Sequence, residues 1–405
     1  MTIRLFTTGL RWSAMLLTLA GGWANVSSAQ QFNDLHRGGS INEPKWEQLA
    51  FCSDCNSGGA YVSDDYGSAY GDAPGCCDDG CCGSCDLECC DTGCCDPCTP
   101  PWAHRTGVWG TFLYLHATGA DMHHAQQQNG TGGAGTTPFG LIGVTDPDHE
   151  PGFRVGGQVA CDMCTSVAVN YTFFESSAID SLDIPANVGG GLGTVGSLVH
   201  HPAADITSSA GPVNADYDLK MQLLDADYRR LFRASNCGWM NYFVGARYGR
   251  LEQDFRQLGT FGGSQGGVID TTTQIDFDGT GLRVGLDGER ILGHGCFSAY
   301  GNLSASALVG SFRGDYRMNN ATTVSDLAIV RWEDDRVAPM LEYEVGLAWT
   351  SCSGCWRAKI GYTAIHWFNV ATTPDFVDAV QADNYVDIGD TLSFSGLTSS
   401  VEWRF

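Results

Sequence analysis

Cysteine is the residue type whose spacing first suggests chemistry in this chain. Of 18 cysteines in 405 residues, 12 lie between Cys52 and Cys98. Five pairs have the Cys-x-x-Cys spacing that serves disulfides, zinc sites or, inside a βαβ unit, redox exchange. The pairs are Cys52/Cys55, Cys82/Cys85, Cys95/Cys98, Cys161/Cys164 and Cys352/Cys355.

Disulfides are the favoured interpretation of these cysteines, because the chain begins like an exported protein and thiols outside the cytoplasm are oxidised. Zinc is the weaker alternative, and no βαβ pattern surrounds any pair to support redox catalysis. The N-terminal cluster predicts bonds within the chain or to neighbouring envelope proteins, and the sequence does not separate the two. Six further cysteines fall in short connections and are predicted to staple them: Cys161, Cys164, Cys237, Cys296, Cys352 and Cys355.

Histidines give little indication of a catalytic or metal site. His200 and His201 with Asp205, and His123 with His124, lie in segments expected to be loops, where histidines are mostly solvated. His116 and His366 fall near predicted strand ends, but no serine motif accompanies them. We therefore expect no enzymatic activity, no metal and no cofactor.

The net charge and the N-terminal residues limit the classes of protein to which this chain can belong. The net charge of -24 argues against nucleic acid as a partner. Arg4 and Arg11 precede an apolar stretch at 12–20, and small residues before Gln30 predict a signal peptide over 1–29. A cysteine-rich, acidic segment follows over 30–104, predicted to be periplasmic and either disordered or disulfide-rich. No later run of about 18 apolar residues predicts a spanning helix.

From residue 105 onward the sequence alternates with period two, which is typical of β-strands. In Met340–Thr350, Leu341, Val345 and Trp349 share one face, while Glu342 and Glu344 share the other. Short turns and long polar connections alternate strictly between such segments. We predict ten strands, at 107–117, 152–160, 165–175, 219–233, 239–252, 279–292, 296–312, 339–350, 356–369 and 392–405.

This arrangement predicts an all-β fold, namely an antiparallel transmembrane β-barrel of about ten strands (range 8–12) over 105–405. Outer-membrane barrels keep their short turns on the periplasmic side and their long loops outside. Lipid of the outer membrane would then cover the apolar outward face. The final strand ends in Val401, Trp403 and Phe405, which resemble the C-terminal signal recognised by the barrel-assembly machinery.

Three segments resemble a known family: "YFVGARYGRLEQDF" at Tyr242–Phe255, "FRVGGQVA" from Phe153, and the terminal aromatic strand. Over about 107–405 the chain is similar to the Legionella-type major outer-membrane protein family, which is described as pore-forming. The resemblance implies a pore, whereas the residues themselves indicate only a barrel. The cysteine-rich segment instead resembles cysteine-rich envelope proteins of planctomycetes.

Charged residues of both signs occupy the face that would point into the lumen. A narrow polar pore would make the protein a porin-like channel for ions or small solutes. Salt bridges could equally fill the lumen, as in barrels near eight strands, leaving a structural envelope protein with a cross-linking cysteine module. The predicted lumen-facing residues are Arg154, Arg247, Arg283, Asp287, Glu289, Glu342, Glu344, Arg357, Lys359 and Glu402.

Overall fold

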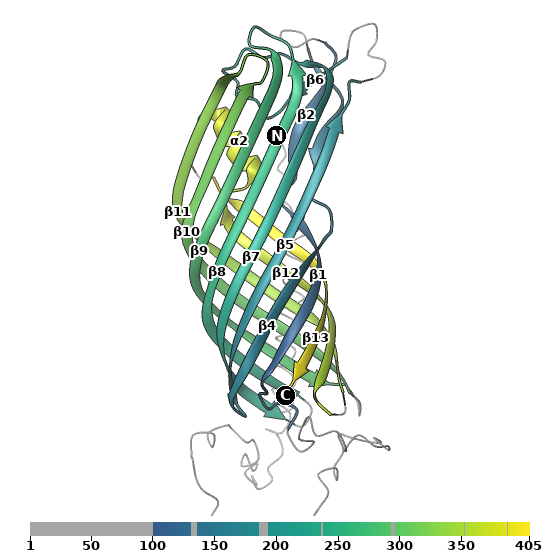
Figure 1. Cartoon of the computed structure of the whole chain (residues 1–405), viewed down its shortest axis with the longest axis vertical. Coiled ribbons are helices and arrows are strands. Elements are labelled where there is room, and N and C mark those ends of the chain that lie inside the picture. The colour runs from purple at the N-terminus through teal and green to yellow at the C-terminus, as the bar shows by residue number, and fades with distance from the viewer. Residues whose placement is uncertain are drawn as a thin grey trace, which may run out of the picture. The chain divides into compact units, whose positions relative to one another are not determined.

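A closed ring of ten antiparallel strands forms the body of the protein (Figure 1). The computed structural model describes residues 100–130, 136–185, 193–235, 238–292, 296–351, 353–386 and 388–405. The predicted signal peptide and nearly all of the cysteine-rich segment lie outside the described residues. The ring strands are β1 (Gly107–Thr118), β4 (Glu150–Asp162), β5 (Thr165–Leu182), β7 (Ser209–Ser235), β8 (Gly238–Phe261), β9 (Gly267–Ile291), β10 (Phe297–Asn320), β11 (Ser325–Thr350), β12 (Trp356–Val370) and β13 (Asp390–Arg404).

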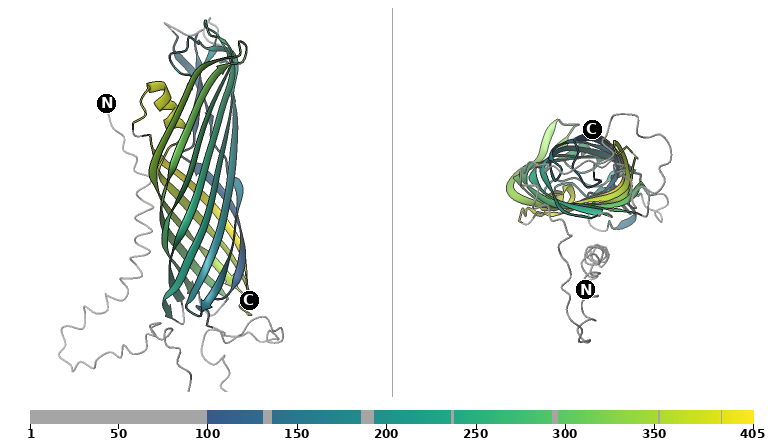
Figure 2. Two further views of the ribbon diagram at one scale, coloured as in Figure 1. Left: turned by 60° about the vertical axis from the view of Figure 1, so that its left-hand side comes forward. Right: turned by 90° about the horizontal axis from the view of Figure 1, so that it is seen from below.

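The first and the last strand of the ring pair with each other and close it, and the view along the axis shows the closed ring (Figure 2). β1 pairs with β13, with Thr111 opposite Ser400, and β7 pairs with β8, with Leu223 opposite Gly249. Every neighbouring pair is antiparallel, so tight turns gather at one end, here called the turn end, and long connections at the other, the loop end. The predicted barrel and its ten strands are confirmed.

Five neighbouring strands run much further toward the loop end than the sequence predicts. β7 to β11 are 24 to 27 residues long, whereas β1, β4, β12 and β13 have 12 to 15. The predicted loops at 253–278 and 313–338 are therefore mostly strand. The expected short connections at the turn end are found.

Smaller elements complete the loop end beside the long strands. β2 (Met122–Gln128) pairs with both β3 (Pro138–Thr145) and β6 (Thr194–Ser197), and β6 pairs with β7. One helix, α2 (Thr373–Ala382), lies in the connection between β12 and β13. Among the described residues no helix has the length and apolar character that a membrane crossing would need.

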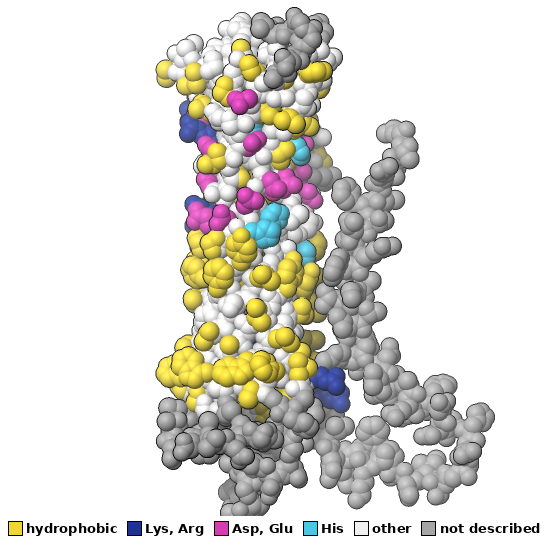
Figure 3. Space-filling model, turned by 90° about the vertical axis from the view of Figure 1, so that its right-hand side faces the viewer, with side chains coloured by type: hydrophobic (Ala, Val, Ile, Leu, Met, Phe, Trp, Pro, Cys, Tyr) yellow, Lys and Arg dark blue, Asp and Glu magenta, His cyan; other side chains and the backbone are white. Residues whose placement is uncertain are grey.

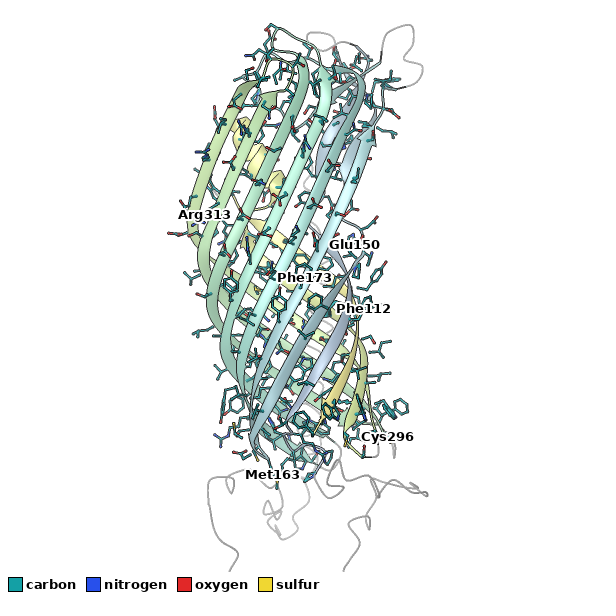
Figure 4. The ribbon with its side chains drawn as sticks, in the orientation of Figure 1. Phe112, Glu150, Met163, Phe173, Cys296 and Arg313 are labelled. Carbon is teal, nitrogen blue, oxygen red and sulfur yellow. The ribbon has the colours of Figure 1, made fainter. Side chains whose placement is uncertain are left out.

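The outer face of the barrel is apolar near the turn end and charged further up (Figure 3). On β11, outward residues are apolar from Val337 to Trp349, whereas Arg331, Glu333 and Asp335 continue the same face toward the loop end. Figure 4 shows Phe112 and Phe173 on the wall of the barrel, with Arg313 further toward the loop end. The apolar band is the surface that membrane lipid covers.

Candidate functional site: the interior of the barrel

Charged side chains fill the interior in two layers near the turn end. The layer further from the turns, here called the second layer, centres on Arg247, which is 2% exposed. Its guanidinium donates to Asp225 (Nε to Oδ1, 2.5 Å) and to Glu342 (Nη2 to Oε2, 2.8 Å). The other members of the second layer are Arg154, Arg283, Asp227 and Glu344.

Glu342 links three arginines of this layer. It accepts from Arg154 (Nη2 to Oε1, 2.7 Å) and Arg247, and lies 3.4 Å from Arg283 Nη2. Buried charges are stable only when they are paired and hydrogen-bonded. Strands β4, β8, β9 and β11 are thereby tied together across the lumen.

The first layer lies next to the turns. Arg229 donates to Asp287 (Nη2 to Oδ1, 2.5 Å), and Asn241 donates to the other carboxylate oxygen at 2.8 Å. Glu289 accepts from Arg357. Glu402 accepts from Arg404 at 2.7 and 3.1 Å and lies 3.8 Å from Lys359 Nζ.

All ten residues predicted to face the lumen lie in these two layers. The prediction did not include Arg229 or Arg404, although both repeat the period-two spacing of inward neighbours, Asp227 on β7 and Glu402 on β13. It also missed Asn241 and Tyr300, whose hydroxyl donates to Glu344 Oε1 at 2.8 Å. Uncharged polar residues gave no signal because they occur on both faces of the strands.

An apolar layer lies in the lumen on the loop side of the charges. Along β11 the inward residues change from Glu344 and Glu342 to Met340 and Ala338. Aromatic rings from five strands pack at this level, with Phe277 stacked on Phe312 at 4.4 Å and edge-on to Trp367 at 5.9 Å. The core members with no exposed surface include Leu113, Leu115, Phe174, Phe277, Phe312, Trp367 and Phe394.

Helix α2 covers this layer from the loop end. Phe376, Val377 and Val380 are buried in the same apolar cluster. Gln253 on β8 fixes the start of the helix, donating to Ala371 O at 2.9 Å and accepting from Thr373 N at 3.1 Å. A Cβ at Gly314 would approach Phe376 Cζ to 2.7 Å, so the glycine makes room for the ring.

The sequence contains a signal for the start of α2. Thr372 is the N-cap and accepts from Asp375 N, Pro374 follows in the first turn, and buried apolar residues recur at helical spacing. Such a threonine and proline mark a helix start. The prediction of a loop over 370–391 was therefore wrong for Thr373–Ala382.

Residues just before β1 line the turn end of the charged interior. Ala103 is buried, and His104 bonds to Ser166 Oγ (2.7 Å from Nδ1) and to Asn241 Oδ1 (3.2 Å from Nε2). Arg105 O accepts from Gln158 at 2.8 Å. The segment 101–105, here called the floor, thus belongs with the barrel rather than with a separate periplasmic segment.

The cysteines lie near the turns, but the predicted pairing is only partly visible. Cys355 is disulfide-bonded, whereas Cys161 is an exposed free cysteine, so no bond joins it to Cys164 here. Cys296 is at the turn end (Figure 4). Cys237 and Cys352 lie outside the described residues, so the pairings that involve them stay predictions.

The histidines considered as candidate sites in the sequence occupy separate places toward the loop end. His124 is buried and bonds to Asp180 (Nε2 to Oδ2, 2.9 Å), while His200 packs edge-on against Phe261. His116 Nε2 is 3.7 Å from Asp146, and His366 Nδ1 is 2.7 Å from Ser393 Oγ, a contact that sequence reasoning missed because it joins two strands. No carboxylate contacts His366, and no three metal-ligating side chains converge, among the described residues.

A family model for the Legionella pneumophila major outer membrane protein precursor matches residues 99–405, a range that includes the whole barrel and its floor. The chain belongs to this family. Together with the apolar band and the ring of strands, membership makes this family member an outer-membrane β-barrel. No curated protein matches the chain. Among solved structures, the outer membrane protease OmpT from Escherichia coli is similar at 9% identity, with a TM-score of 0.42, over 75% of this chain and 97% of that one.

Proposed function

We propose that this protein is a structural outer-membrane barrel, closed to bulk solutes, that holds its N-terminal segment at the envelope. The observation that carries the proposal is the apolar layer, in which side chains from six strands of the ring have no exposed surface. An open channel would leave its lining in contact with water. Catalysis is not part of this role.

The strand number agrees with a filled interior. Barrels of about eight strands enclose just enough space for their own side chains, and open aqueous channels have many more strands. Ten strands enclose little more, and here two charge layers, an apolar layer and α2 occupy that space. The floor, from Pro101 to Arg105, connects the barrel to the preceding chain, whose cysteines we propose to bond to neighbouring envelope proteins.

A porin-like channel is the second candidate, favoured by the polar interior that extends from the floor to Arg154 and Glu342. Conduction would require α2 and the aromatic rings to leave the lumen. Moving them would expose about seven fully buried apolar side chains. Burial of each such side chain stabilises the fold by roughly 1.5 to 3 kcal/mol. The channel is therefore an alternative that needs a large rearrangement.

Single-channel recording in planar bilayers tests the proposal. We expect no conductance steps from the full chain, with or without a reductant, in a bilayer where an open porin conducts. The double variant Phe277→Ala with Phe312→Ala removes two rings from the apolar layer. It should pass a larger leak current than the unmodified protein. Stable ohmic steps from the unmodified protein would overturn the closed barrel and favour the channel.

A further inference from the structure

The floor lies against the turn end of the charged interior and bonds to the barrel through its backbone. His104 N donates to Met163 O at 2.9 Å, and Arg105 O accepts from the side chain of Gln158 at 2.8 Å. A cavity of about 170 Å³ is lined by the floor together with side chains of both charge layers. Displacement of the floor would therefore open this end of the interior to water.

The imidazole of His104 joins the floor to two strands of the ring. Nδ1 lies 2.7 Å from Ser166 Oγ on β5, and Nε2 lies 3.2 Å from Asn241 Oδ1 on β8. The amide of Asn241 donates from Nδ2 to Asp287 at 2.8 Å, which directs its oxygen toward the imidazole. Nε2 therefore carries the hydrogen, and Nδ1 accepts from the Ser166 hydroxyl. These contacts fit the neutral ring.

A second proton on the imidazole would disturb the contact with Ser166. Nδ1–H and the hydroxyl hydrogen of Ser166 would then be directed at each other. Ser166 has no exposed surface, so a hydroxyl that turned away from Nδ1 would not meet water. Loss of an acceptor by a buried donor is destabilising, so the docked floor disfavours the charged ring.

The environment of His104 also affects its charge. Burial is the largest influence and lowers the pKa of His104 from 6.5. Arg229 on β7 acts in the same direction, whereas the carboxylates of Asp287 on β9 and Asp162 at the end of β4 favour the charged ring. The contact with Asn241 also raises the pKa, but burial outweighs it. β5 and β8 contribute the two uncharged hydrogen-bond partners.

We propose that the floor is a pH-sensitive latch, docked while His104 is neutral and released from the turn end when the imidazole is protonated. Between the lowered pKa and 6.5, a released His104 binds a proton that the docked one does not, so release becomes more favourable as pH falls. Above pH 6.5 both forms are neutral and the floor stays docked. The apolar layer lies on the other side of the charges, so release leaves the barrel closed, and the two proposals are tested by different measurements.

Hydrogen exchange of the detergent-purified full chain tests the latch, measured from about pH 7.5 to 5.5 and corrected for the intrinsic exchange rate at each pH. The amide of His104 is the reporter, because it donates to Met163 O in the docked floor. We expect its protection factor to fall below pH 6.5 by up to tenfold for each pH unit, since release binds one proton. Unchanged protection would overturn the proposal. Protection that rises in acid would also overturn it, because Asp287 and Asp162 would then stabilise the charged ring in the docked floor.

The variant His104→Gln separates titration from the docking of the floor, because glutamine donates and accepts hydrogen bonds but binds no proton in this range. We expect its protection factor to stay constant with pH. His116→Gln, at a partly exposed histidine toward the loop end, is the matched control and should keep the pH response of the unmodified protein. A response in His104→Gln equal to that of the unmodified protein would assign it to other groups and contradict the latch.

A check that needs no variant is the pKa of His104 itself, measured by nuclear magnetic resonance on the unmodified protein. We expect a value below 6.5, because the docked floor holds the neutral ring. A value at or above 6.5 would show that the docked floor does not disfavour the charged ring, and the latch would be wrong.

Discussion

Phe277 and Leu282 are five residues apart on β9 and face opposite sides of the wall. Phe277 is fully buried inside, whereas Leu282 is 73% exposed on the outside. The polar residues beside them are reversed in the same way, since Arg283 is inside and Asp278 outside. Between these positions the strand passes from lipid to water, and its apolar face changes sides.

Arginine substitutions along the outward face of β11 should locate this boundary. We expect Val345→Arg to lower the free energy of unfolding by about 2 to 4 kcal/mol, because a charge near the middle of the bilayer is poorly solvated. Ile329→Arg, on the same face beyond the boundary, should change stability by less than about 0.5 kcal/mol. Urea unfolding in lipid vesicles, followed by tryptophan fluorescence, measures both, and equal costs would contradict the assigned boundary.

Glu342→Gln should be strongly destabilising, since it removes the carboxylate shared by Arg154, Arg247 and Arg283. Breaking a buried ion pair from one side costs about 3 to 5 kcal/mol. Glu333→Gln is the control, because Glu333 pairs with Arg313 on the exposed surface and should contribute less than about 1 kcal/mol. Similar unfolding midpoints for the two variants would show that the second layer is not a stabilising network.

Phe376→Ala tests whether α2 is part of the core. The ring is completely buried, so we expect the substitution to lower the free energy of unfolding of the loop end by about 3 to 5 kcal/mol. Hydrogen exchange should accelerate in α2 and in the facing part of β10, near Gly314. Val386→Ala, at a side chain that is 73% exposed, should leave exchange unchanged. Unaltered exchange in Phe376→Ala would mean that the helix is not held by its apolar face.

Acid should destabilise the loop end through His200. Burial lowers the pKa of His200 from 6.5 to about 4, and the side chain packs on Phe261. Between those two values the unfolded state binds a proton that the folded state does not, so stability falls as pH falls, by up to about 3 kcal/mol. Above pH 6.5 both states are neutral and the effect vanishes.

His200→Leu should remove this contribution and flatten the pH dependence of unfolding between pH 6.5 and 4. The measurement is the difference in unfolding free energy between the variant and the unmodified protein at each pH, which cancels the other titrating groups. A difference that stays constant with pH would show that folding does not shift the pKa of His200.

The lipid-crossing part of the fold could be predicted because lipid imposes a simple pattern there. Leu282, Val284 and Leu286 alternate with polar residues, and each strand was recognised where such outward residues occur. Beyond the boundary the alternation continues with reversed sense, as in Ile275 and Phe277 between Gln274, Asp276 and Asp278. Acidic residues in these segments suggested loops, so the predicted strands ended at the membrane.

The charges of the interior were also predictable, but their arrangement was not. Period two places Arg247 and Glu342 on inward faces, and no local pattern shows that they meet across the lumen from β8 and β11. Nor does it show that Trp367 fills the space beside Gly249, whose Cβ would approach Trp367 Cη2 to 2.9 Å. Whether the barrel is open or closed depends on these contacts between residues that are far apart in the sequence, and no local sequence pattern predicts them.

The edge-on contact between Phe174 on β5 and Phe394 on β13, at 5.6 Å, has a consequence for the order of assembly. The apolar layer draws residues from β1 at the start of the barrel and β13 at its end, so it forms only when β1 and β13 pair. Contacts between segments so far apart in sequence form late and slowly. Until then an unclosed sheet exposes apolar side chains on both faces, so the last intermediate before closure should be the species most prone to aggregation.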